Sequence, residues 1–151
     1  MKHLLIIYHS QSGSTRTLAE ATFAGALLEP DVETRLLRAM EAGIADLLWC
    51  DAIIFGTPEN LGYMSGGLKD FFDRTFYPAA PHQLNIAYGL FISAGNDGTG
   101  AIRQIQRIAR GYPMREVAAP VVVCGEVSAD GVQSCRELGN ALAAGLSLGI
   151  F

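Results

Sequence analysis

One short segment of this chain gathers hydroxyl side chains around a glycine, which is the chemistry of an anion-binding turn. Its residues are Ser10, Gln11, Ser12, Gly13, Ser14 and Thr15. The hydroxyls can donate hydrogen bonds, and Gly13 lets the backbone curl so that successive N–H groups converge. Hydrogen bonds to a charged group contribute about 1.5–3 kcal/mol each, so four or five would hold a phosphate without a cation.

The residues on either side of this turn predict a strand before it and a helix after it. Leu4–Tyr8 is an apolar run, and from Thr15 onward apolar and small residues recur every three or four positions. The first N–H groups of a helix have no intrahelical partner and carry partial positive charge, which favours an anion. A serine-capped helix following an ordinary strand is the simpler alternative.

Several phosphate-binding motifs are excluded by what the turn lacks. It contains no lysine, so it is not a Walker A loop, and it has no G-x-G-x-x-G dinucleotide pattern. It also lacks the cysteine and arginine of a thiol phosphatase. Arg16 is the only charge nearby, so a monophosphate ester is the expected guest.

Composition indicates one ordinary α/β domain, residues 1–151, in a reducing compartment. Hydrophobic residues make up 50% of the 151 residues and the net charge is −4, which disfavours non-specific nucleic-acid binding. No apolar run approaches the roughly 20 residues of a membrane helix, and no signal peptide is visible. The cysteines Cys50, Cys124 and Cys135 fit no metal motif and are expected to be buried and reduced. We therefore predict a cytoplasmic location and expect neither a metal ion nor a membrane as a partner.

Strands and amphipathic helices alternate along the whole chain. The expected strands are 3–9, 32–37, 51–56, 86–93 and 117–124, the last interrupted near Pro120; the expected helices are 14–28, 41–48, 65–76, 99–111 and 130–148. This alternation predicts a doubly wound, five-stranded parallel sheet with helices on both faces. The alternating pattern of 32–37 is typical of an edge strand, which favours the order 2-1-3-4-5.

Two further loops follow strands at the same edge, where ligands bind in such sheets. The loop 57–64 contains Pro58, Glu59, Asn60, Leu61, Gly62, Tyr63 and Met64. Its backbone could contact a flat heterocycle and its large apolar residues could form a wall for a ring, although a mobile surface loop is the alternative. The third loop contains Ser93, Ala94, Gly95, Asn96, Asp97 and Gly98. Asp97 is expected to cap the following helix.

Taken in order, these motifs resemble the flavodoxin-like superfamily over the whole chain. The segment 10–15 matches the [ST]-x-[ST]-G-x-T phosphate loop, and 55–58 with 62–69 resembles the flavin-ring loop of NAD(P)H-dependent FMN reductases and quinone oxidoreductases. The resemblance implies that Ser10–Thr15 hold the FMN phosphate, that Pro58–Met64 contact the ring, and that Ser93–Gly98 flank its pyrimidine end. It implies no obligatory catalytic residue, because the flavin performs the redox chemistry. Tyr63 is the candidate for shaping the substrate face.

The resemblance favours a reductase over an electron carrier. Flavodoxins place aromatic residues on both faces of the ring, whereas no aromatic lies between Ser93 and Gly100 here, which would leave one face open. We therefore expect electrons to pass from NAD(P)H through FMN to a quinone or similar small acceptor. A flavodoxin-type electron carrier is the alternative. The second loop departs from the P-x-Y-N form of many FMN reductases. Relatives often complete the site with a second subunit, so a homodimer is compatible with the resemblance.

Two other features have simpler interpretations. A phospho-acceptor regulator on this fold would need clustered aspartates at the ends of the first and third strands, where His9–Ser10 and Gly56–Thr57 stand. Arg103, Arg107 and Arg110 form a stripe on one helix that could meet a nucleotide phosphate, but a solvated helix face is the simpler assignment.

Overall fold

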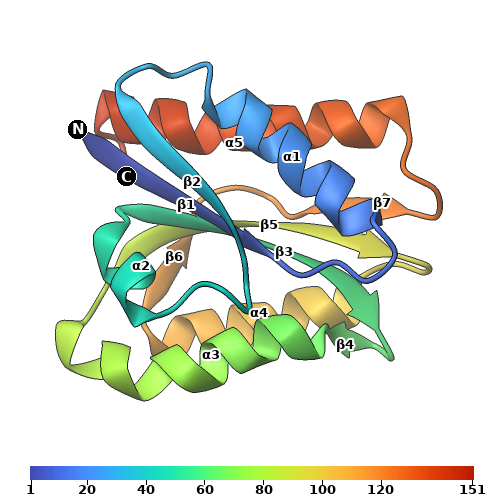
Figure 1. Ribbon diagram of the computed structural model, residues 1–151, viewed down its shortest axis with the longest axis horizontal. Helices are drawn as coiled ribbons and strands as arrows, with labels where there is room; N and C mark the ends of the chain where they lie inside the picture. The colour runs from blue at the N-terminus through green and yellow to red at the C-terminus, as the bar shows by residue number, and fades with distance from the viewer.

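The computed structural model describes residues 1–151 and is organised around a parallel sheet with helices on both faces (Figure 1). Its strands are β1 Lys2–Tyr8, β2 Val32–Arg38, β3 Ala52–Asn60, β4 Tyr63–Met64, β5 Ile86–Ala94, β6 Met114–Glu116 and β7 Val121–Cys124. The sheet runs β2-β1-β3-β5-β6, and β7 also pairs with β5. The strand β5 is the fourth of the five predicted strands, and β6 and β7 take the place of the fifth. The observed order therefore matches the predicted order 2-1-3-4-5, and the fold class is confirmed.

Two helix layers enclose the sheet. The helices are α1 Ser14–Ala26, α2 Ile44–Trp49, α3 Gly66–Ala79, α4 Thr99–Gly111 and α5 Ala129–Leu148, with a short 3-10 turn at Ala80–His82. Figure 1 shows α1 and α5 on one face and α2, α3 and α4 on the other. The interior strand β1 contributes side chains to both cores: Leu5 and Ile7 join the core under α3 and α4, whereas Leu4 and Ile6 join the core under α1 and α5. All four side chains are fully buried, as expected for a parallel strand covered on both faces.

Close packing between α1 and α5 fixes the helix that follows the hydroxyl-rich turn. A Cβ built on Gly25 would lie 1.9 Å from the Arg136 carbonyl oxygen, and one on Gly139 would lie 1.9 Å from that of Thr22. The glycines therefore let the two backbones touch. This contact holds α1, and with it the turn at its N-terminus, in a defined position against the sheet.

Several expected element boundaries were wrong, including the start of α2, which begins at Ile44 and not at residue 41. Residues 57–64 were expected to form a loop, but β3 continues to Asn60 and turns back into β4, with Glu59 paired to Met64 and Asn60 to Tyr63. The helix expected to end at Phe76 continues through Pro78, because a proline in the last turn removes only one hydrogen bond and already has a helical φ.

The predicted strand 117–124 forms only over its second half, β7, and a further short strand, β6, lies just before it. Met114–Glu116 pairs with the start of β5 and Val121–Cys124 with its end, so the break around Pro120 is longer than the sequence suggested. The break lies at the edge of the sheet. A proline has no N–H group to donate to the hydrogen-bond ladder, and an edge strand tolerates such an interruption.

The cysteine prediction holds for two of the three thiols. Cys50 and Cys135 are buried, whereas Cys124 is exposed, which corrects the expectation. Cys124 ends β7, where the side chain leaves the covered part of the sheet. None of the helices combines the length and apolar character needed to cross a lipid bilayer.

Candidate functional site

The three predicted loops lie next to one another at the carboxyl edge of the sheet, and hydrogen bonds join them. The Asn60 side chain donates to the Gln11 side-chain oxygen at 3.1 Å, which links the second loop to the first. The Glu59 carboxylate accepts from the backbone nitrogens of Gly100 at 2.9 Å and Ala101 at 3.2 Å, which links the second loop to the start of α4 after the third loop. Segments far apart in the sequence therefore form one continuous surface.

The first loop curls around Gly13, as its sequence predicts. Gly13 has a φ of 105°, which an L-residue adopts only with strain, and its nitrogen donates to Ser10 Oγ at 3.1 Å. Gly13 is also the N-cap of α1, and no side chain caps this helix. The N–H groups of the first turn of α1 are therefore available to an external acceptor.

In α3, α4 and α5 a side chain accepts a hydrogen bond from an N–H group of the first helical turn. The acceptors are Ser65 for α3, Asp97 and Glu59 for α4, and Ser128 for α5. In α1 and in the six-residue α2 the only such hydrogen bond involves the N-cap nitrogen, from Gly13 to Ser10 and from Gly43 to Asp46. Among the longer helices, α1 alone leaves its first-turn N–H groups free, and it does so within a turn rich in hydroxyls. This donor set, N–H and O–H groups without a paired cation, fits a phosphate monoester.

A cavity of about 630 Å³ lies beside this loop. Its wall includes residues 8–13 and also Arg16, Arg38 and Glu41. Both arginines are already paired: Arg16 with Glu20 at 3.0 Å and Arg38 with Glu41. The donors that remain available beside this cavity are therefore the backbone and hydroxyl groups of the loop, and their binding of an anion stays a prediction.

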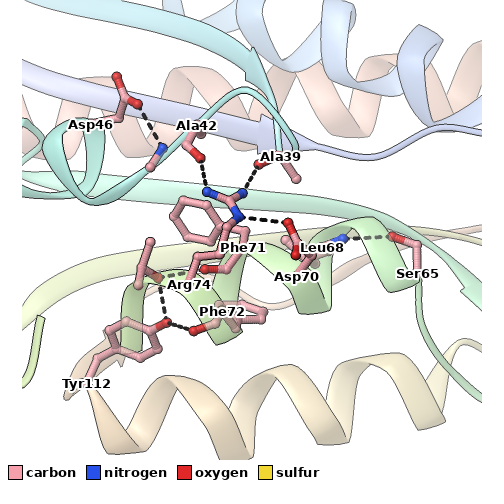
Figure 2. A network of polar contacts seen from close by, with 12 residues as sticks. Ala39, Ala42, Asp46, Ser65, Leu68, Asp70, Phe71, Phe72, Arg74 and Tyr112 are labelled. Carbon is pink, nitrogen blue, oxygen red and sulfur yellow. Dashed lines mark hydrogen bonds and ion pairs between the residues drawn. The ribbon is translucent and has the colours of Figure 1, made fainter. Parts of the chain in front are cut away.

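Arg74 of α3 holds the far wall of this cavity in place. Figure 2 shows its guanidinium donating to the carbonyl oxygens of Ala42 at 2.8 Å and Ala39 at 2.9 Å, while Asp70 accepts a third hydrogen bond at 2.7 Å. Asp70 and Arg74 are four positions apart, so this ion pair spans one turn of α3. The attachment to the segment after β2 was not apparent from the sequence, because those two partners are backbone carbonyls.

The second loop is a tight hairpin with a strained tip. Leu61 and Gly62 have φ values of 53° and 72°, and positive φ at both central residues is the pattern of a type I′ turn. Leucine is unusual there, and the Leu61 side chain is fully exposed, with a relative exposure of 106%. At the base, Thr57 Oγ1 accepts from the Ser65 nitrogen at 2.9 Å and donates to the Pro58 carbonyl at 2.8 Å. The hairpin is therefore rigid at its base and apolar at its tip.

The third loop is held from two sides. Asp97 accepts from the Thr99 nitrogen at 3.1 Å and hydroxyl at 2.9 Å, so its predicted capping role is confirmed. The hydrogen bond from the Thr99 backbone is the main reason that the pKa of Asp97 is lowered. On the other side, the Cys124 thiol donates to the Asn96 carbonyl oxygen at 2.7 Å. Ser93, Gly95 and Gly98 complete a loop whose polar groups lie at the same edge as the first two.

Some of the predicted site side chains already have structural partners. Glu59 and Asp97 cap α4, and Met64 is 2% exposed and belongs to the core. Tyr63 is half-buried and lines a groove between α3 and α4. Any contact of these residues with a ligand ring would therefore come from the hairpin and loop backbone, and these contacts stay predictions.

Two features of the site were missed from the sequence. A Cβ on Gly100 would lie 2.0 Å from the Gly62 carbonyl oxygen, so this glycine lets the hairpin rest against α4. Its position in the first turn of a helix, where glycine is otherwise unfavourable, is the signal that could have indicated close packing. His9 packs against Gly67, and its Nδ1 is buried without a hydrogen-bond partner. No group of three or more histidine, cysteine or acidic residues could hold a metal ion.

A parallel sheet of this order, with a phosphate-type turn after β1 and two further loops at the same edge, defines the flavodoxin-like class. Comparison with protein families is more specific. The model of the family described as NADPH-dependent FMN reductase matches residues 2–133, and the chain belongs to this family. It is accordingly an FMN-binding flavoprotein.

Individual relatives agree with this assignment. A curated flavodoxin from Aquifex aeolicus is 38% identical over 73 residues, which span 48% of this chain but only 40% of that protein. A solved flavodoxin from the domain Archaea superposes with a TM-score of 0.85 at 22% identity, covering 96% of this chain and 99% of that one. A flavodoxin, WrbA-like protein from Agrobacterium tumefaciens superposes with a TM-score of 0.79 at 24% identity, covering 95% and 96%. At these identities the two solved structures support the fold alone.

Proposed function

We propose that this protein is an oxidoreductase that passes electrons from NAD(P)H through bound FMN to a quinone or similar small acceptor. The single observation that carries the proposal is the uncapped N-terminus of α1 at Gly13, because the other long helices, α3, α4 and α5, have side-chain acceptors for their first-turn N–H groups. Family membership supports the same cofactor and a nicotinamide donor.

In this proposal the chain binds and orients the cofactor and supplies no reacting group. Ser10–Thr15 hold the phosphate through N–H and O–H donors, and the backbones of Pro58–Met64 and Ser93–Gly98 hold the ring. The flavin, when bound, supplies the two-electron chemistry. Overall, one NAD(P)H and one proton reduce one quinone to its hydroquinone. The absence of aromatic residues from the third loop supports an accessible ring face.

An electron carrier is the second candidate, and the tip of the hairpin favours it. Leu61 is a fully exposed leucine held at a positive φ, and backbone strain is commonly kept where it serves a function. An apolar tip at the edge of a flavin site would suit a protein partner. The similarity to solved flavodoxins is compatible with this role.

Two measurements test the proposal. FMN titrated into cofactor-free protein should show saturable fluorescence quenching with one FMN per chain, and failure to bind would end both candidates. NADH and NADPH oxidation should then be followed anaerobically with and without a soluble quinone. The reductase predicts rapid quinone-dependent oxidation of one of them, whereas a carrier would be nearly inert without a separate reductase.

A further inference from the structure

A groove of about 480 Å³ runs between α3 and α4, which lie side by side in Figure 1. It is separate from the cavity beside the first loop and shares no residue with it. Tyr63 of the hairpin lines the groove, and so do Gln104 and Gly111 of α4, which are seven positions apart. At 1.5 Å per helical residue, the groove follows α4 for about 10 Å, in the direction away from the N-terminus of this helix at the third loop.

An aromatic corner lies in this groove. The rings of Phe76 and Tyr77 meet edge to face, with centroids 5.4 Å apart and an interplanar angle of 89°. Phe76 fits between the helices because Gly111 has no side chain: a Cβ there would lie 2.9 Å from the Phe76 ring. Tyr77 is 80% exposed, so it contributes little to the core. Two perpendicular aromatic rings can contact a flat ring by face and by edge together.

The groove also contains a cation without an acidic partner. Arg107 makes no ion pair, whereas Lys69, also in the groove, is bonded to Asp73. Arg110, one turn further along α4, is exposed but does not line the groove. A free guanidinium recognises phosphate by paired hydrogen bonds, and it can also stack on a planar base.

We propose that this groove binds the adenosine-phosphate half of the nicotinamide donor. The inference rests on the proposed function, because the occupant must be a molecule that reaches the flavin site at the hairpin. Of the two small molecules that the reaction needs, only the donor carries a purine for the aromatic corner and phosphates for Arg107. Tyr63, which joins the groove to the hairpin, marks the direction in which the nicotinamide end extends. This assignment gives the exposed Tyr77 and the unpaired Arg107 one common role.

ADP-ribose, the donor without its nicotinamide, is the probe for this proposal. The probe is titrated by calorimetry into protein that is saturated with FMN. Because FMN then occupies the phosphate loop, the measured heat reports on binding to the groove. We expect saturable binding that Arg107→Ala weakens about tenfold or more, since one lost charge-assisted pair corresponds to at least that factor. Tyr77→Leu should weaken binding as well. Arg110→Ala, the matched control of equal charge change on the same helix, should leave it unchanged.

Kinetics and hydrogen exchange give independent readouts. Arg107→Ala should raise the KM for NAD(P)H while leaving kcat near the unaltered value, because it removes binding and not chemistry. ADP-ribose should slow amide exchange in residues 69–77 and 104–111. The proposal is overturned if ADP-ribose does not bind, if Arg110→Ala weakens it as much as Arg107→Ala, or if protection appears elsewhere. Each of these results can occur in protein that binds FMN and oxidises NAD(P)H, so failure of the groove is distinguishable from failure of the proposed function.

Discussion

The Glu59 carboxylate lies 2.9 Å from the backbone nitrogen of Gly100 and accepts a hydrogen bond from it. A residue of the second loop therefore caps the helix that begins after the third loop. A second contact of the same hairpin requires a glycine at position 100, since a Cβ there would lie 2.0 Å from the Gly62 carbonyl oxygen. The hairpin and α4 consequently form one unit at the edge of the candidate flavin site.

Replacing Glu59 should loosen this unit. Glu59→Ala removes two hydrogen bonds to helix N–H groups and should lower the free energy of unfolding by about 1–2 kcal/mol. Glu59→Gln keeps one acceptor oxygen and should lose less, because only the charge at the positive end of the helix is removed. Urea unfolding measures both, with the exposed Glu126→Ala as the control. Equal stability of Glu59→Ala and the unaltered protein would show that the cap has no energetic role.

Gly13 should be sensitive to substitution although its surroundings are open. No atom lies within 4 Å of a Cβ built there, so Gly13→Ala introduces only backbone strain at a φ of 105°. We expect a loss of about 1–3 kcal/mol of stability or a shifted turn. Either result would misdirect the free N–H groups of α1, so the dissociation constant for FMN should rise at least tenfold, as fluorescence titration can measure.

Gly66→Ala is the matched control for Gly13→Ala. It also meets no atom within 4 Å and begins a helix, but its φ is not positive. It should therefore bind FMN normally. Unchanged FMN affinity in Gly13→Ala would contradict the assignment of this turn as the phosphate site.

The local pattern around Gly13 shows why part of the site was predictable from the sequence. An apolar run, a hydroxyl-rich turn and a helical period are neighbours in the chain, so their geometry depends on short-range rules. The order of the strands followed from alternation and from the edge character of 32–37, and it was confirmed. Contacts between loops were not accessible in the same way. The Glu59–Gly100 and Asn60–Gln11 hydrogen bonds join residues 41 and 49 positions apart, and no local pattern encodes them.

The burial of Cys124 was mispredicted for a related reason. A cysteine at the end of an apolar strand resembles a core residue, but its exposure depends on what covers the strand's end. The end of β7 at the sheet edge leaves the Cys124 side chain exposed, and its thiol donates a hydrogen bond to the Asn96 carbonyl oxygen. The hairpin at Leu61 and Gly62 was missed because such turns usually contain Asn-Gly, and this one contains Leu-Gly. Leucine rarely adopts a positive φ, so the sequence did not indicate a turn.

Arg74 should control the wall of the cavity beside the phosphate turn. Arg74→Ala removes the hydrogen bonds to the Ala39 and Ala42 carbonyls shown in Figure 2. Because hydrogen bonds to a charged group contribute about 1.5–3 kcal/mol each, stability should fall by roughly 2 kcal/mol after solvent screening of the half-exposed guanidinium. Amide exchange in residues 39–43 should accelerate.

Arg74→Lys should restore little of this stability, because an ammonium cannot make the same fork of three bonds. The exposed Arg136→Ala provides a control for loss of a surface arginine. If Arg74→Ala left exchange in residues 39–43 unchanged, another contact would have to hold that segment.

Buried thiols and phenols should make the protein unstable in alkali. Burial raises the pKa of the Cys50 thiol to about 12, with a smaller effect from the Asp51 charge, and it raises the pKa of Tyr112 to about 12 as well. In the unfolded chain a thiol titrates near 8.5, so the unfolded state loses its proton first. The stability contributed by the neutral Cys50 is therefore complete below about pH 8.5 and is lost as pH rises towards the folded pKa.

Between its unfolded and its folded pKa, each such group should lower the free energy of unfolding by up to about 1.4 kcal/mol per pH unit, and this interval begins near pH 8.5 for Cys50 and near pH 10 for Tyr112. Denaturant unfolding under reducing conditions between about pH 9 and 11 should therefore give a shallower slope for Cys50→Ala than for the unaltered protein. Cys124→Ala removes an exposed thiol and should keep the original slope. Comparing slopes separates titration from the constant cost of the cavity that Cys50→Ala creates. Identical slopes for all three proteins would mean that the Cys50 thiol ionises as readily in the folded protein as in the unfolded chain.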